Sequence, residues 1–282
     1  MEKKYGGDEL HALQSCELDI LGVIDDICKK YRIPYSLYSG SLLGAVRHHG
    51  FIPWDDDIDI CMKRDDYDRF LAAWMESSPS GFFLQNKENS PSFTQTFTKI
   101  RKEHTTFLQY PWEAGRYHTG IFVDVFPLDR IPAVRSQQFL YKIRTAIFLL
   151  LTREFVPEEE NFLTRIVSFL FLMVVRGNMR IQLRRHLEKK LKEYNHDHSL
   201  PLVGFDTLAG LNQKYPSDMM DDFTNMSFQG REFPCCKDWD SQLGVLYGDY
   251  MTLPPEEERT WKHHPIILDF EHDYEELQRA GE

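Results

Sequence analysis

Apolar and polar positions in the first part of the chain follow two different periods. Residues 8–30 carry apolar side chains three and four positions apart, which predicts an amphipathic helix. The apolar run at 35–38 predicts a short buried strand, and residues 42–47 predict a short helix. The helical spacing returns over residues 65–75. This order predicts helices that pack against strands.

Residues 82–126 have the shorter period of β-strands. Four runs separated by Pro, Gly and polar turns predict strands: FFLQN, QTFTKIRK, TTFLQY and GIFVDVF. Farther along, residues 226–235 predict a hairpin about Gln229-Gly230, residues 237–248 a short helix, and residues 268–282 an acidic tail. Helices followed by strands of mixed spacing indicate an α/β or α+β domain.

The pattern changes after Pro132, where strongly apolar helices are predicted at 136–153 and 161–175, separated by PEEE at 157–160. Each is shorter than the roughly 20 apolar residues that span a bilayer. Residues 176–192 follow with seven basic residues and one acidic residue, a local charge of +6. An apolar helix beside a basic one is typical of a surface that contacts an anionic membrane. Two core helices followed by a solvated basic helix explain the same pattern, and the sequence leaves both readings open.

Composition narrows the class of protein. With 282 residues, 42% of them apolar and 27% charged, the chain has the size and balance of a globular protein with one large or two small cores. Its net charge of −11 argues against general binding of nucleic acid, which needs a basic surface. The N-terminus lacks the apolar region of a signal peptide, so a cytoplasmic location is expected. Five cysteines without C-x-x-C spacing predict buried free thiols in a reducing compartment: Cys16, Cys28, Cys61, Cys235 and Cys236.

The run FIPWDDDIDICM is the main candidate for chemistry. Read as a strand, it alternates Asp55, Asp57 and Asp59 with neighbours that face the other way, so these carboxylates point in one direction. Like charges this close repel, and a divalent cation with oxygen ligands relieves the repulsion. Asp56 is expected to be structural. Acidic runs are often simply solvated, but Trp54 and the isoleucines argue against a fully solvated face here.

Asp124 supplies another carboxylate inside the apolar run GIFVDVF. Because an unpaired buried carboxylate is costly, it needs a partner or a cation. Asp57, Asp59 and Asp124 together can bind one or two Mg²⁺ (or Mn²⁺) ions, which bridge phosphate oxygens in phosphoryl transfer. A set of aspartates without His or Cys favours magnesium over zinc.

Phosphate-binding groups are expected near these acids. The Gly40-Ser41 turn can present N–H groups and a hydroxyl to a phosphate, with Ser41 as the cap of the helix that follows. Arg47, Lys99 and Arg101 are candidates to neutralise a polyphosphate. Taken alone, each of the three is more often a surface residue than a phosphate ligand.

Several stretches together resemble a known family. GSLLGAVRHHGFIPWDDDIDI, followed by TKIRK, GIFVDVFPLD and YGDYMTLPPEEER, closely resembles the LicD family of bacterial phosphocholine transferases, which is related to the fukutin-related ribitol-phosphate transferases. The resemblance covers roughly Leu10 to His263. The family belongs to the nucleotidyltransferase-fold superfamily, whose pattern is Gly-Ser, then Asp-x-Asp, then a third carboxylate on another strand. The positions that match, in that order, are Gly40-Ser41, Asp57 with Asp59, and Asp124, with Asp55 as an additional family acid.

The resemblance implies an α+β, nucleotidyltransferase-like fold, in which helices flank a mixed sheet and a helical region is added. It implies three parts: a catalytic core at 1–132, a helical insertion at 133–199 that can face a membrane, and a C-terminal part at 200–282 that completes the active site.

The implied reaction is magnesium-dependent transfer of a phospho-alcohol, foremost phosphocholine from CDP-choline, with CMP leaving. The implied acceptor is a hydroxyl of a cell-surface glycan (teichoic acid, lipopolysaccharide or capsule) or of its lipid-linked precursor, reached by an enzyme on the inner face of the plasma membrane. Asp124 is expected to help deprotonate that hydroxyl. Two alternatives stay open: ribitol- or glycerol-phosphate transfer from a CDP donor, and a non-catalytic nucleotide-binding protein.

A choline cargo would need an aromatic cage for its quaternary ammonium group. Aromatic residues flank the motifs at Tyr110, Trp112, Tyr117, Tyr247, Tyr250 and Trp261. Aromatic side chains pack in cores more often than they form cages, and both readings apply here.

Overall fold

The computed structural model describes residues 6–153 and 162–281, which divide into two compact units. The first unit consists of Met1–Gln85, Phe97–Pro127 and Asp218–Glu282, and the second of Asn86–Thr96 and Leu128–Ser217. This division differs from the predicted ranges 1–132, 133–199 and 200–282, because residues 200–217 pack with the helices of the second unit. The PEEE stretch at 157–160 lies outside the described residues.

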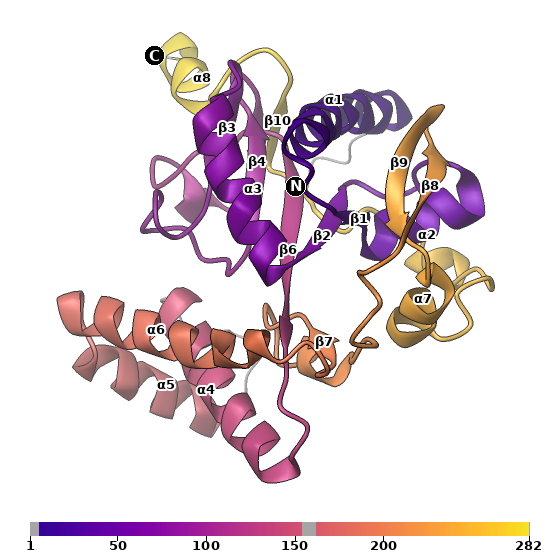
Figure 1. The fold of residues 1–282 in the computed structure, drawn as a ribbon. Helices are drawn as coiled ribbons and strands as arrows, with labels where there is room; N and C mark the ends of the chain where they lie inside the picture. Colours follow the sequence, from indigo (N-terminus) through magenta and orange to yellow (C-terminus); the bar gives the residue numbers. More distant parts are fainter. Residues whose placement is uncertain (1–5, 154–161, 282) are drawn as a thin grey trace. The chain divides into compact units, whose positions relative to one another are not determined.

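Three helices precede most of the strands in the first unit (Figure 1): α1 (Gly7–Tyr31), α2 (Ser39–His48) and α3 (Arg64–Ser77). The helices predicted at 8–30, 42–47 and 65–75 are thereby confirmed. However, α2 begins three residues earlier than predicted. Gly40 and Ser41 therefore lie in its first turn, and the expectation that Ser41 caps the helix is wrong.

The main sheet has the strand order β1-β2-β6-β4-β3. Its strands are β1 (Ser36–Leu37), β2 (Asp59–Lys63), β3 (Phe82–Gln85), β4 (Thr98–Lys102) and β6 (Phe122–Arg130). Strand β4 pairs antiparallel with β6, and this register sets Lys99 opposite Asp124. The mixed sheet with flanking helices confirms the predicted α+β class.

Two further strand pairs complete the first unit. Strands β8 (Phe223–Phe228) and β9 (Arg231–Cys236) form the predicted hairpin, and β5 (Thr106–Leu108) pairs with β10 (Ile267–Asp269). The remaining elements are η1 (Pro111–Glu113), α7 (Trp239–Tyr247), η4 (Glu256–Glu258) and α8 (Tyr274–Gly281). The acidic tail predicted from Leu268 is wrong, because this segment supplies β10 and α8.

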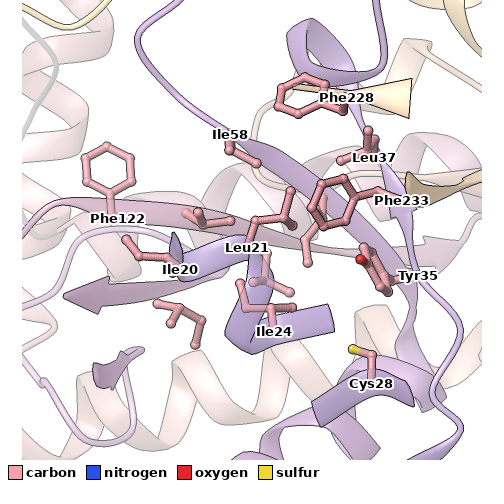
Figure 2. Packing of buried hydrophobic residues seen from close by; sticks show 14 of the residues in the cluster. Ile20, Leu21, Ile24, Cys28, Tyr35, Leu37, Ile58, Phe122, Phe228 and Phe233 are labelled. Carbon is pink, nitrogen blue, oxygen red and sulfur yellow. The ribbon is translucent and has the colours of Figure 1, made fainter. Parts of the chain in front are cut away.

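Helix α1 provides much of the core of the first unit. Ile20, Leu21 and Ile24 are fully buried, which agrees with their helical spacing. Figure 2 shows these side chains among those of Leu37, Ile58, Phe122, Phe228 and Phe233. One continuous core therefore joins α1 to strands from both ends of the chain, and it supports the loops that carry the acidic residues.

The five cysteines are buried and unpaired, as predicted: Cys16, Cys28, Cys61, Cys235 and Cys236. Burial raises the pKa of the Cys16, Cys235 and Cys236 thiols to about 12. These thiols are therefore weak nucleophiles that serve as small core side chains.

The second unit is built from α4 (Arg135–Arg153), α5 (Phe162–Val174), α6 (Gly177–Lys192), η2 (Glu193–His196), β7 (Leu202–Val203) and η3 (Gly210–Asn212). Its core includes Tyr141, Phe148, Leu187 and Phe205. Within the described residues, no single helix has both the length and the apolar character needed to cross a membrane. The helices Arg165–Val174 and Gly177–His196, bent by 114°, meet that criterion only when taken together.

Candidate active site

A cavity of about 430 Å³ in the first unit brings the acidic loop next to a segment two hundred residues later in the chain. Its wall includes the predicted acids Asp55, Asp57 and Asp59. Gly40 and Arg47 of α2 also line it, as do Tyr247 and Tyr250. The structure therefore joins seven of the residues predicted from sequence in one cavity.

The acids converge on this cavity although they do not share a strand. Strand β2 begins at Asp59, so the expected strand from Phe51 is wrong for residues 55–58. Asp55 instead closes a turn by donating its N–H to the carbonyl of Ile52 at 2.9 Å. The hydroxyl of Ser41 accepts a hydrogen bond from the N–H of Asp59 at 2.8 Å. The acids therefore reach the cavity through a turn at Asp55 and a contact with helix α2 at Asp59, and not through the alternation of side chains along one strand.

Asp56 holds the loop to the C-terminal segment. It is fully buried, and its two carboxylate oxygens accept the N–H groups of Lys262 and His263 at 3.1 and 2.8 Å. Each of these bonds supplies a partner to a charge that would be costly to bury alone. These hydrogen bonds agree with the structural role expected for Asp56. They also hold Lys262 at the wall of the cavity.

Burial and mutual repulsion disfavour the ionised form of the acids. Burial raises the pKa of Asp57 to about 6, with Asp56 and Asp124 adding to the rise and His263 opposing it. Burial, followed by the charge of Asp57, raises the pKa of both Asp55 and Asp59 well above the ordinary value. A bound cation would relieve this repulsion.

Free carboxylate oxygen is present where such a cation would bind. Among the described residues, Asp55 Oδ2 is a buried oxygen with no hydrogen-bond partner. The donors around the cavity are aspartate oxygens, the ligands that Mg²⁺ prefers. The acids of the cavity therefore offer the type of donor that a hard divalent cation takes. In the described part of the chain, the group at this site whose ligand atoms all lie within 4.8 Å of one another is Asp56, Asp57 and His263.

Asp124 is paired inside the sheet. Its two oxygens accept hydrogen bonds from Lys99 Nζ at 2.8 and 2.9 Å, and both residues are buried. Lys99 Nζ also lies 3.2 Å from the ring centroid of Phe122. Asp124 lies beside the acidic loop, because its N–H donates to the carbonyl of Ile58 at 2.9 Å. The charge of Asp124 contributes to the raised pKa of Asp57, but Asp124 is not among the residues that line the cavity.

The two strand cations predicted to bind phosphate are placed differently. Lys99 is held by Asp124, and Arg101 donates to Gln85 Oε1 and to the carbonyl of Gly120, both at 2.6 Å. Neither lines the cavity, whereas Arg47 does, and its guanidinium donates to the carbonyl of Tyr250 at 2.9 Å. Arg47 and Lys262 are thus the cations at the wall.

The predicted aromatic residues separate into two groups. Tyr110, Trp112 and Tyr117 contact one another, with ring centroids 5.7 and 6.2 Å apart along the series, and do not line the cavity. Tyr247 and Tyr250 line it, together with Trp54, which was not predicted. Trp261 packs against the core of the first unit.

Glu17 and His263 are two further neighbours of the acids. Glu17 is 1% exposed, and its Oε2 has no hydrogen-bond partner among the described residues. Burial, followed by the charges of Asp57 and Asp56, raises its pKa well above the ordinary value. His263 Nδ1 lies 3.8 Å from Asp57 Oδ2. Glu17 was not among the predicted site residues, although a carboxylate on the apolar face of a predicted helix was a signal for it.

Gly40 is required by the close approach of Asp55. A Cβ atom at Gly40 would lie 2.7 Å from Asp55 Oδ2. We expect Gly40→Ala to displace this carboxylate and to lower the free energy of unfolding by about 1–3 kcal/mol, measured by urea denaturation. Gly244→Ala in α7, where nothing lies within 4 Å, is the matched control. It should be neutral or gain up to about 1 kcal/mol, and equal losses in the two variants would contradict the steric argument.

Comparisons with known proteins identify the family of this chain. Residues 32–153 match the profile described as LicD/FKTN/FKRP, nucleotidyltransferase domain. The lipopolysaccharide cholinephosphotransferase LicD of Haemophilus influenzae is 30% identical over 262 residues, which cover 87% of this chain and 92% of that protein. An uncharacterized protein of Rickettsia typhi is 41% identical over 86 residues, or 30% of this chain and 27% of that protein. The profile match includes α2, the acidic loop and Asp124, whereas the cavity segment from Tyr247 to Lys262 lies beyond it.

Proposed function

The chain belongs to the LicD family, and from this premise we propose that it transfers phosphocholine from CDP-choline to a hydroxyl of lipopolysaccharide or a similar cell-surface glycan, or of its lipid-linked precursor. The relative from Haemophilus influenzae, a lipopolysaccharide cholinephosphotransferase, supports the cargo and the class of acceptor. The observation that carries the proposal is the cavity in which Asp55, Asp57 and Asp59 converge beside Arg47 and Lys262.

These residues suit a nucleotide diphosphate held through a cation. Asp57 and Asp59 would hold Mg²⁺ (or Mn²⁺), with Asp124 as the third carboxylate. When bound, the cation would neutralise charge on the diphosphate and on the leaving CMP. Arg47 and Lys262 would bind the outer phosphate oxygens. Asp124 would take the proton of the acceptor hydroxyl. Because it lies outside the cavity wall and both its oxygens accept hydrogen bonds from Lys99, this role requires Lys99 to release one of them.

The aromatic wall supports choline as the cargo. Trp54, Tyr247 and Tyr250 line the cavity together with the acidic residues Asp249 and Glu258. Ring faces and carboxylates attract a quaternary ammonium group, whereas ribitol and glycerol are neutral polyols that gain little from them. Arg259 lies over the ring of Trp54, 5.7 Å from its centroid, so choline would bind the other face of this indole or displace Arg259.

Comparison of CMP release from CDP-choline, CDP-ribitol and CDP-glycerol tests the donor. We expect CDP-choline to give the highest kcat/KM, and Trp54→Leu to lower that value about 10-fold through loss of the cation–π contact. Trp112→Leu is the matched control, because its ring lies in the separate aromatic cluster. Equal turnover of the three donors would support the ribitol or glycerol alternative. Binding of CDP-choline without any CMP release would support a non-catalytic protein.

Divalent metal is expected to stabilise the protein in a pH-dependent way. The folded-state pKa of Asp57 is raised to about 6, so the metal-free fold loses stability as pH rises from the ordinary value of 3.8 through 6. Because a cation binds the ionised form, Mg²⁺ should raise Tm at pH 8 and have little effect at pH 5. At 100-fold excess over Kd the gain corresponds to about 2.7 kcal/mol.

Thermal melts with Mg²⁺ or EDTA across this pH range measure the effect. In the double variant Asp57→Asn/Asp59→Asn, the difference between Mg²⁺ and EDTA should vanish at every pH. A shift that is independent of pH, or one that survives in the double variant, would mean that the ion binds elsewhere.

A further inference from the structure

Helix α5 of the second unit is apolar on two opposite faces. Leu172 is buried, Phe171 packs against the core of this unit, and Val175, directly after the helix, belongs to that core. The other face is exposed to solvent, with exposed fractions of 39–74%: Ile166, Val167, Phe169, Leu170, Met173 and Val174. We call these six residues the α5 surface. A helix that is apolar all round is normally buried in protein or in lipid, so this exposure calls for a second partner.

Two basic residues flank the α5 surface, although four glutamates precede the helix at positions 154–160 of the sequence. Arg165 stands at the start of its exposed residues and Arg176 lies two residues after the helix ends, and both are exposed. No acidic residue occurs between them. Over residues 135–192 the sequence has twelve Lys and Arg against five Asp and Glu, a net charge of +7 in a chain of −11. This asymmetry distinguishes the α5 surface from a simple site of self-association, because like charges on two copies would repel.

The length of the helix determines how it could meet a membrane. Thirteen residues extend about 20 Å, which is short of the roughly 30 Å hydrocarbon core of a bilayer. A short helix with one exposed apolar face and basic residues at its ends lies in the plane of the interface, where long basic side chains reach the lipid headgroups.

We propose that the α5 surface docks on the interface of an anionic bilayer, with its apolar side chains among the acyl chains and Arg165 and Arg176 at the headgroups. This docking is independent of the transfer reaction, although it would suit an acceptor carried on lipid.

Vesicle flotation of the full chain tests the proposal. We expect the protein to float with vesicles of phosphatidylglycerol and phosphatidylethanolamine, and about 10-fold less with phosphatidylcholine alone or in about 0.5 M salt. Phe169→Ser/Leu170→Ser and Arg165→Glu/Arg176→Glu should each lower the floating fraction about 10-fold. The matched control is Met75→Ser/Leu208→Ser, which removes two exposed apolar side chains elsewhere and should float like the unchanged chain.

Circular dichroism melts establish that each variant is folded, and CMP release in detergent-free buffer reports the transfer reaction separately. Absence of flotation with anionic vesicles would overturn the proposal, as would equal loss in the Met75/Leu208 control. Concentration-dependent dimerisation that Phe169→Ser/Leu170→Ser abolishes would assign the surface to a second copy instead. If flotation persists while CMP release is absent, the docking stands and the proposed function fails.

Discussion

Asp57→Asn is expected to lower CMP release from CDP-choline by about 10²–10³-fold, the range for loss of one preorganised charge at a transferring group. Asn is nearly isosteric with Asp, but it carries no charge for a cation. The same change should stabilise the metal-free protein by roughly 1–3 kcal/mol at pH 8, because a carboxylate whose pKa is raised to about 6 is unfavourable when ionised in the fold. Activity assays and thermal melts of one preparation measure both effects.

The opposite directions of these two changes make the prediction specific. A misfolded variant would lose activity and melting temperature together, whereas we expect lower activity with a higher Tm in EDTA. Asp59→Asn should behave in the same way, since burial, followed by the charge of Asp57, raises its pKa too. Asp222→Asn is the control, because that side chain is 79% exposed and lies outside the cavity. Undiminished turnover in both Asp57→Asn and Asp59→Asn would refute the proposed metal-dependent transfer.

Lys99→Met is expected to lower the free energy of unfolding by about 3–5 kcal/mol, the cost of leaving one member of a buried ion pair alone. Met keeps most of the volume of the side chain beside Phe122, so the loss comes from the Asp124 carboxylate. That carboxylate would be left in the sheet without its ammonium partner and near the charge of Asp57. Urea denaturation of the metal-free protein measures the effect.

Lys102→Met is the matched control on the same strand. Lys102 forms an ion pair with Asp19 at 3.0 Å, but the two side chains are 32% and 61% exposed. Exposed pairs contribute only about 0–1 kcal/mol. The double variant Lys99→Met/Asp124→Leu should recover much of the lost stability, because no uncompensated charge remains. Equal effects of Lys99→Met and Lys102→Met would show that the Lys99–Asp124 pair is not structurally important.

Local pattern in the sequence was sufficient for most of the elements. Helical spacing predicted α1 and α3 to within a few residues, since burial of one helix face repeats at short range. Alternating runs predicted β3 to β6 in the same way. The acids Asp55, Asp57 and Asp59 stood out because carboxylates among apolar residues are costly unless they have a function.

Tertiary contacts decided which predicted residues meet. The register of β4 against β6 set Lys99 on Asp124, so a residue predicted to bind phosphate became the partner of a carboxylate. Of the two aromatic groups, only the one near Tyr247 reaches the cavity, because α7 packs beside α2.

The acidic run that the sequence singled out lines the cavity, but its residues 55–58 form a loop and not the predicted strand. The close spacing of Asp55, Asp57 and Asp59 among apolar residues was enough to select them as the candidate site. Local spacing contains no information on hydrogen bonds between residues about two hundred positions apart, such as those from Lys262 and His263 to Asp56. Those bonds hold the run as a loop instead of a strand and bring Lys262 to the wall of the cavity. Local sequence was sufficient to single out the candidate acids, whereas the cavity that they line was completed by long-range packing.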